Sequence, residues 1–159
     1  MSNKKHTDIL VIGSGPGGYA AAFRAADLGR EVTLVDKDPT LGGVCLNRGC
    51  IPSKTLLHIA KVLEEAESLK KMGVTFTKPT IDIDLVRDWK NKVVSQLSGG
   101  IGQMAKARKV NTLQAEATFL SDNEVQLKSE SNIEKITFDH CIIASGSSST
   151  IIPGIPFDN

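Results

Sequence analysis

The spacing of three glycines near the amino end constrains the fold of this chain more than any other feature of its sequence. Gly13, Gly15 and Gly18 follow the apolar run 9–12, which has the composition of a strand buried on both faces. An Ala-rich helical pattern begins at these glycines, and Asp36 stands at the end of the next apolar run. This order predicts a strand–helix–strand unit of the kind that binds dinucleotides.

Each of the three glycines has its own expected role. Gly13 allows a tight turn, Gly15 lets the backbone approach a pyrophosphate, and Gly18 allows close packing of the helix on the strand. The amides at the start of the helix then face the phosphates. Asp36 is placed to accept hydrogen bonds from ribose hydroxyls and would repel a 2'-phosphate, which disfavours an NADP adenosine here. The pattern does not choose between NAD and FAD, and a glycine-rich turn without function is the alternative.

The rest of the chain has the pattern of two helices followed by short strands. Apolar residues recur at helical spacing through 54–73 and again through 80–109. From residue 110 the period changes towards two, and 110–120, 124–129 and 135–146 have the pattern of strands. This order of elements predicts the α/β class, with a central parallel sheet and a small antiparallel β-meander.

An apolar face marks the segment 80–109 as an amphipathic helix. Its members are Leu85, Trp89, Val93, Leu97, Ile101 and Met104. Gly99 and Gly100 either weaken the middle of this helix or mark a close packing contact.

Composition argues against several classes of function. A formal net charge of +1 disfavours a nucleic-acid partner, which usually requires a concentrated basic surface. No stretch approaches the roughly 18 to 20 apolar residues of a membrane span. The polar first eight residues lead directly into a strand pattern and leave no room for a signal or transit peptide. We therefore expect a cytoplasmic location, where paired cysteines are more often metal ligands or redox groups than structural disulfides.

Two of the three cysteines, Cys45 and Cys50, lie in the stretch GGVCLNRGCIPSK and have three competing interpretations. A zinc site needs four ligands, typically with two to four residues between paired cysteines. Cys141 lies in an apolar strand pattern and the three histidines show no ligand spacing, so we expect no metal. Two inert core cysteines would not ordinarily need so many glycines nearby. The third interpretation is a redox-active pair.

A redox-active pair makes a geometric demand on the backbone. Residues five apart on a regular helix have Cα atoms roughly 8.6 Å apart, whereas a disulfide rarely spans more than about 7 Å. Cys45 and Cys50 therefore cannot both lie on an undistorted helix and be bonded. Gly49 and Pro52 are the residues that permit a distortion. The positive end of a helix stabilises a thiolate when such a disulfide opens, and Lys54 adds a nearby positive charge.

Three motifs in order, GSGPGG, GGVCLNRGCIPSK and CIIASGS, resemble those of the pyridine nucleotide–disulfide oxidoreductases. Within that family, GCIPSK after GGVCLN is most similar to the dihydrolipoamide dehydrogenase branch, and the mercuric reductases are the next most similar. The likeness extends over nearly the whole chain. It implies a Rossmann-like FAD-binding domain.

The resemblance also implies a set of FAD-binding residues. Lys54 would lie near the flavin N5 and Ala117 would meet the adenine through its backbone. Family members often have glutamate where this chain has Asp36, so the contact distance to the ribose would differ. The full set is Gly13, Gly15, Pro16, Gly17, Gly18, Asp36, Lys37, Gly42, Gly43, Val44, Cys45, Lys54, Ala117, Ala144, Ser145 and Gly146.

The implied chemistry is a two-electron relay. Dihydrolipoamide would attack a Cys45–Cys50 disulfide at Cys45, the exchange thiol, and Cys50 would pass the electrons to the flavin. NAD would be the co-substrate of the full-length enzyme. The implied partners are the lipoyl domains of 2-oxo acid dehydrogenase complexes and a second copy of the enzyme in a homodimer.

Family enzymes are longer than this chain and carry parts that the sequence does not show. It has no second glycine fingerprint and no Gly-Asp dipeptide of the type that returns to the FAD domain. We therefore expect residues 1–159 to be the amino-terminal part of an FAD-binding domain, incomplete at its carboxyl end, without the NAD and dimer-interface domains. We expect such a fragment alone to be inactive. A nucleotide-binding module without catalysis is the alternative.

Overall fold

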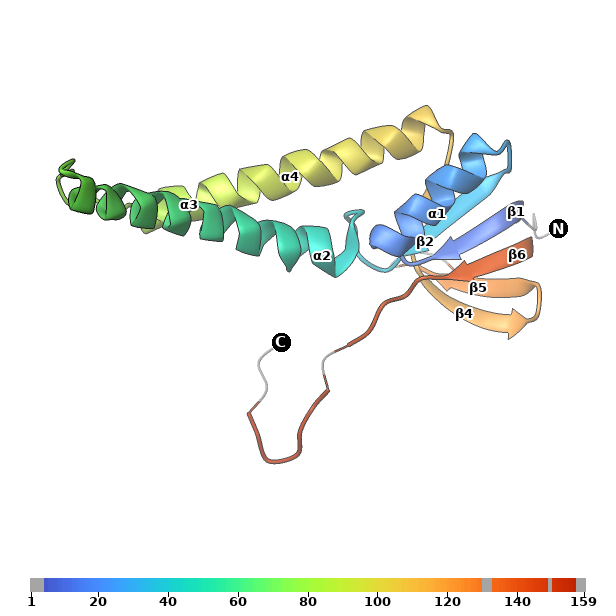
Figure 1. Ribbon diagram of the computed structural model, residues 1–159. Helices are drawn as coiled ribbons and strands as arrows, with labels where there is room; N and C mark the ends of the chain where they lie inside the picture. The colour runs from blue at the N-terminus through green and yellow to red at the C-terminus, as the bar shows by residue number, and fades with distance from the viewer. Residues whose placement is uncertain (1–4, 130–132, 149, 157–159) are drawn as a thin grey trace.

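A computed structural model describes residues 5–129, 133–148 and 150–156 as an α/β protein built on one six-stranded sheet. The order of the strands is β3-β2-β1-β6-β5-β4. The helical segments lie to one side of this sheet, and α3 and α4 extend away from it as a long arm (Figure 1). The predicted α/β class is confirmed.

Four strands form the parallel part of the sheet: β1 (Lys5–Ile12), β2 (Val32–Asp36), β3 (Asn111–Gln114) and β6 (Ile133–Ile143). β1 lies between β2 and β6, and its residues 9–12 pair with both neighbouring strands. Helix α1 (Pro16–Asp27) connects β1 to β2 and forms the strand–helix–strand unit that the glycine spacing predicts.

The antiparallel meander consists of β4 (Glu116–Ser121), β5 (Glu124–Lys128) and the first part of β6. The sequence pattern predicted one strand over 110–120, whereas the structure divides it between β3 and β4. The division falls at Ala115, whose N–H donates to the carbonyl of Asp36 over 2.8 Å. The chain changes there from a parallel pairing with β2 to an antiparallel pairing with β5.

Both faces of the sheet carry a hydrophobic core, because successive strand residues point to opposite sides. Val11, Val32 and Leu34 pack with Phe23 of α1 on one face. The other core contains Leu10, Val35, Ala115, Val125, Leu127, Ile136 and Phe138.

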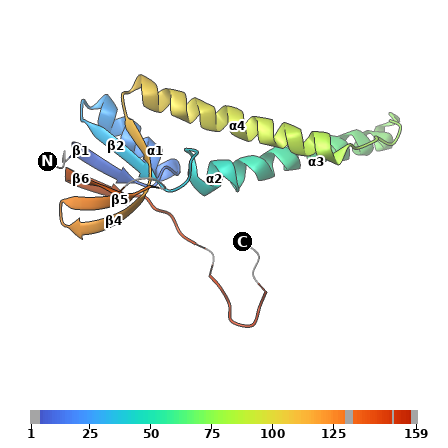
Figure 2. The same cartoon turned by 180° about the vertical axis from the view of Figure 1, so that it is seen from behind.

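Helix α2 (Gly43–Asn47) precedes the arm, which contains α3 (Cys50–Ser68), the 3₁₀ turn η1 (Leu69–Met72) and α4 (Ile83–Ala107). Figure 2, which views the molecule from behind, shows α3 and α4 running side by side away from the sheet. Asp82 caps α4, since its Oδ1 accepts hydrogen bonds from the amides of Asp84 and Leu85 over 3.0 and 3.1 Å. None of the described helices is long and apolar enough to cross a membrane.

The apolar face predicted for α4 is largely exposed. An amphipathic pattern is typical of a helix packed on a core, but only Ile101 of that face is buried, near the end of α4 that reaches the sheet. Trp89 is 54% exposed and Leu85 66%. The helix continues through Gly99 and Gly100, and a Cβ at either would meet nothing within 4 Å among the described residues, so no close contact explains them.

Candidate functional site

The loop between β1 and α1 is shaped by two glycines that have no room for a side chain. Gly13 has φ +100°, and a Cβ there would collide with the backbone carbonyl of Ala144. A Cβ on Gly18 would collide with the carbonyl oxygen of Gly13. The turn and the helix–strand packing therefore both depend on glycine, as the spacing predicts.

The amino end of α1 is suited to bind an anion. Gly15 is the N-cap and Pro16 the first helical residue, where the missing amide hydrogen of proline costs nothing. Within the described first turn, no acidic residue and no side-chain cap neutralises the positive helix end. A Cβ on Gly15 would meet nothing within 4 Å, so the backbone is accessible at the point where a pyrophosphate is expected.

A cavity of about 210 Å³ lies beside this loop, at the carboxyl ends of β1 and β2. Ligands of open α/β sheets bind at this edge. The lining residues are Ile12, Gly13, Val35, Asp36, Lys37, Ala115, Glu116, Ala117 and Ser145. Five of them belong to the predicted FAD-binding set: Gly13, Asp36, Lys37, Ala117 and Ser145. This lining fits the adenosine half of a dinucleotide, because Asp36 can accept from a ribose, Ala117 borders the space for an adenine and the glycine turn is open towards phosphates.

The carboxylate of Asp36 is held in a fixed position by three hydrogen bonds. Its Oδ2 accepts from both the amide and the hydroxyl of Ser14, each over 2.6 Å. Its Oδ1 accepts from the amide of Asp38 over 2.9 Å. Partial burial raises the pKa of Asp36, but these hydrogen bonds and the charge of Lys37 outweigh burial and hold the pKa below its usual 3.8. The carboxylate is therefore ionised at neutral pH.

The two cysteines of the GGVCLNRGCIPSK stretch lie on different helices. Cys45 is in α2, and Cys50 is the first residue of α3. Gly49 separates them with φ −116° and ψ −101°, which is not helical. The predicted distortion is therefore present, and it falls at Gly49. Pro52 takes no part in the break, because it lies in the first turn of α3, where a proline is tolerated.

Cys45 and Cys50 are close enough for a hydrogen bond between them. A hydrogen bond with Cys50 raises the pKa of the Cys45 thiol above its usual 9.0, and partial burial adds to the rise. The backbone at Cys50 and the charge of Lys54 act in the opposite direction and are weaker. The pair therefore differs in environment: the Cys45 thiol holds its proton more firmly than usual, and Cys50 begins a 19-residue helix, whose amino end is electropositive.

The glycine loop and the cysteine helices are joined by direct backbone contacts. The amide of Gly42 donates to the carbonyl of Ser14 over 2.9 Å. A Cβ on Gly43, which has φ +60°, would lie 2.7 Å from the Cα of Gly15. These contacts fix the start of α2 on the dinucleotide loop, so the two motifs form one site.

The other predicted residues lie directly after β6 and on α2 and α3. Ala144 continues β6, with its amide donating to the carbonyl of Ile12 over 2.8 Å, and packs against the glycine turn. Gly146 follows with φ +72°. Val44 is exposed on α2 and Lys54 is exposed on α3, and neither lines the cavity beside Asp36.

Sequence reasoning missed Ser14, which occupies an unspecified position of the glycine pattern. It is fully buried, and its amide, hydroxyl and carbonyl all bond to residues of the site. A polar residue in the buried turn after a strand, facing an acid at the end of the next strand, was the signal that could have found it.

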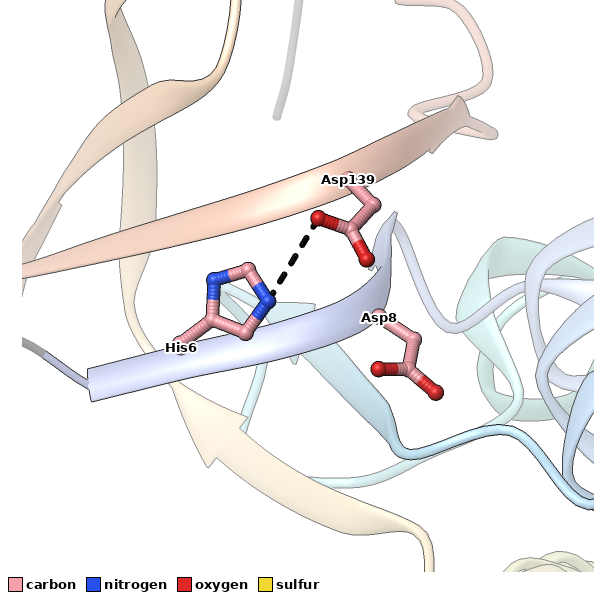
Figure 3. A group of neighbouring side chains, drawn as sticks. All are labelled: His6, Asp8 and Asp139. Carbon is pink, nitrogen blue, oxygen red and sulfur yellow. Dashed lines mark ion pairs between the residues drawn. The ribbon is translucent and has the colours of Figure 1, made fainter.

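One further group of ionisable side chains lies away from the cavity, towards the amino end of β1. Figure 3 shows His6, Asp8 and Asp139, with His6 paired to Asp139 over 3.5 Å. Their ligand-type atoms lie within 4.8 Å of one another. Asp8 also accepts a hydrogen bond from the amide of Glu31 over 3.0 Å, which ties β1 to the start of β2. These contacts join β6 to β1 and β1 to the start of β2.

Comparisons with known proteins show the family of this chain. The family model described as pyridine nucleotide-disulphide oxidoreductase matches residues 7–158. A dihydrolipoyl dehydrogenase of Buchnera aphidicola is 50% identical over 159 residues, which are 100% of this chain and 34% of that protein. The dihydrolipoyl dehydrogenase of Vibrio cholerae is 48% identical over the same shares, and that of Bacillus subtilis is 46% identical over 95% of this chain and 32% of its own length. This chain thus spans about a third of the relatives it matches, and it belongs to the pyridine nucleotide–disulphide oxidoreductases.

Proposed function

We propose that this chain carries the FAD-binding and redox-active parts of a dihydrolipoamide dehydrogenase. The observation that carries the proposal is the junction at Ser14, Gly42 and Gly43, which fixes the cysteine helices on the dinucleotide loop. A module that only binds a nucleotide would not need two cysteines held at this place. The names of the relatives support the same activity.

The residues of the cavity fit FAD. The amides at the start of α1 and the open Gly15 would hold the pyrophosphate, Asp36 would accept from the ribose, and Ala117 would meet the adenine. The segment 42–45 and the segment 144–146 would border the rest of the cofactor, and Lys54 would lie at the flavin. When bound, FAD supplies a two-electron acceptor for the cysteine pair.

The chain's own chemistry in this proposal is thiol–disulfide exchange. A thiolate of dihydrolipoamide attacks Sγ of Cys45, the bond to Cys50 breaks, and Cys50 leaves as a thiolate. The second substrate thiol then displaces Cys45 from the mixed disulfide and closes the substrate's own disulfide. The substrate loses two electrons and the cysteine pair gains them. Cys45 is the sulfur attacked in the first displacement and the leaving group in the second, so its raised pKa slows only the second displacement.

Cys50 is suited to be the leaving thiolate of this exchange. It is the first residue of α3, where unpaired backbone amides and the helix dipole favour negative charge. The exchange thiol and the charged thiol are thereby distinguished by position alone.

The wider activity is part of the same proposal. We propose that NAD is the final acceptor, that it binds to chain outside these 159 residues, and that residues 1–159 alone do not turn over with NAD. The proposed partners are lipoyl domains of 2-oxo acid dehydrogenase complexes and a second copy of the full-length enzyme. The proposed location is the cytoplasm.

Counting thiols and observing flavin tests the proposal. After treatment with lipoamide, the unfolded chain should show one thiol, that of Cys141, and three after reduction. A Cys50→Ser control should show two in both states. The chain should also bind FAD with the visible absorption of a protein-bound flavin. Three thiols after lipoamide treatment would rule out the exchange chemistry, and the absence of FAD binding would rule out the cofactor site.

A further inference from the structure

Ser14 bonds to two separate parts of the site, although the glycine pattern leaves its identity open. Its side chain is fully buried. Its amide and its hydroxyl both donate to Oδ2 of Asp36 over 2.6 Å, and its carbonyl accepts from the amide of Gly42. A single residue thus connects the acid at the end of β2 to the start of the cysteine helices.

The contacts of Ser14 determine which acceptor positions Asp36 still offers. An ionised carboxylate has about four lone-pair positions, two on each oxygen. Ser14 fills both positions on Oδ2, and the amide of Asp38 fills one on Oδ1. One position on Oδ1 remains for a hydroxyl from the cavity that Asp36 lines.

We propose that Ser14 is a positioning residue for the nucleotide ribose, fixing the Asp36 carboxylate so that a single Oδ1 acceptor addresses one ribose hydroxyl. The proposal rests on the proposed function, because it takes the adenosine ribose to lie at Asp36. Without the Ser14 hydroxyl, Oδ2 would keep only the amide bond, and the carboxylate could rotate away from the ribose. The amide and carbonyl of the residue would remain, so the junction to Gly42 would persist in a Ser14→Ala variant.

A ligand pair that differs only at the ribose tests this role. ADP and 2',3'-dideoxy-ADP share adenine and phosphates, and only ADP offers hydroxyls to Asp36. Hydrogen bonds to charged groups are stronger than those between neutral groups, so partial loss of one predicts that S14A weakens ADP binding by roughly tenfold. The same change should weaken dideoxy-ADP binding by less than about twofold. Calorimetric titration of both ligands measures the ratio.

Thr7→Val is the matched control. Thr7 is also fully buried, in the same strand–turn segment, and its hydroxyl donates to the carbonyl of Glu31 over 3.0 Å. The control removes a buried hydroxyl that does not contact Asp36. It should lower stability without changing the ratio of ADP to dideoxy-ADP affinity.

A second measurement does not depend on the ligand. NMR titration of the Asp36 carboxyl should give a pKa below 3.8 in the wild-type chain and a higher one in S14A, because the hydroxyl bond favours the ionised form. Equal weakening of both ligands by S14A, or an unchanged Asp36 pKa, would overturn the role of Ser14 alone. Failure of the wild-type chain to bind ADP would overturn the nucleotide site and the ribose contact with it.

Discussion

The space around the glycines differs between the two main regions of this molecule. In the dinucleotide region, formed by β1, α1 and β2, Gly13 and Gly18 sit where a methyl group would collide with backbone. In the helical arm, formed by α3, η1 and α4, a side chain on Gly99 or Gly100 would meet nothing within 4 Å. Burial differs in the same way, since the strands carry the core and α3 has no buried residue. Tertiary packing thus fixes the first region, whereas local helix chemistry fixes the second.

The largest effect is expected from Gly18→Ala. A Cβ at this position collides with the carbonyl of Gly13, and neither backbone can move without shifting β1 or α1. We expect the free energy of unfolding to fall by about 4 kcal/mol, measured by urea denaturation. The neighbouring Gly17→Ala is the control, because its Cβ would be 4.0 Å from Cβ of Ala144, an ordinary contact. Equal losses from the two changes would show that close packing of α1 on β1 is not what selects glycine.

The next effect compares two leucines, one from each region. Leu34 of β2 is fully buried, whereas Leu57 of α3 is 65% exposed. Leu34→Ala should lower the free energy of unfolding by about 3 kcal/mol, through lost burial and the cavity left behind. Leu57→Ala should change it by less than about 0.5 kcal/mol. A comparable loss at Leu57 would mean that α3 is buried in solution and that the contrast between the regions is wrong.

The same contrast explains which features could be predicted from the sequence. The strand–helix–strand unit, Asp36 at the end of β2 and the break between Cys45 and Cys50 follow from short-range rules about glycine and chain geometry. Such rules do not depend on the rest of the fold. The structure confirms the corresponding predictions.

The remaining features depend on contacts between distant segments. The division of 110–120 into β3 and β4 occurs where the pairing of this segment passes from β2 to β5, two strands far apart in the sequence. The role of Ser14 requires knowledge of where the Asp36 side chain lies. The periodicity of α4 gives a helix correctly, but it does not say what covers the apolar face.

A smaller effect is expected from the cap of the arm. Asp82→Ala removes an acceptor for the amides of Asp84 and Leu85. We expect a loss of about 1 kcal/mol, concentrated in faster hydrogen exchange of the first turn of α4. Asp88→Ala, at an exposed position inside the same helix, serves as the control and should change exchange little. Uniform acceleration across the sheet would show that the arm and the sheet unfold as one unit.

The smallest effect has the opposite sign and separates space from backbone conformation. Gly100→Ala replaces a helix-interior glycine where a methyl group has room, so lower backbone entropy of the unfolded chain should raise stability by about 0.5–1 kcal/mol. Gly73 also has open space around it, but it ends η1 with φ +88°. Gly73→Ala should therefore lower stability by about 1 kcal/mol, since an L-residue resists that conformation. Thermal unfolding of the two variants measures both signs. If both variants are more stable than the wild type, open space alone decides the effect. If both are less stable, Gly100 is closely packed in solution, as the glycines of the dinucleotide region are.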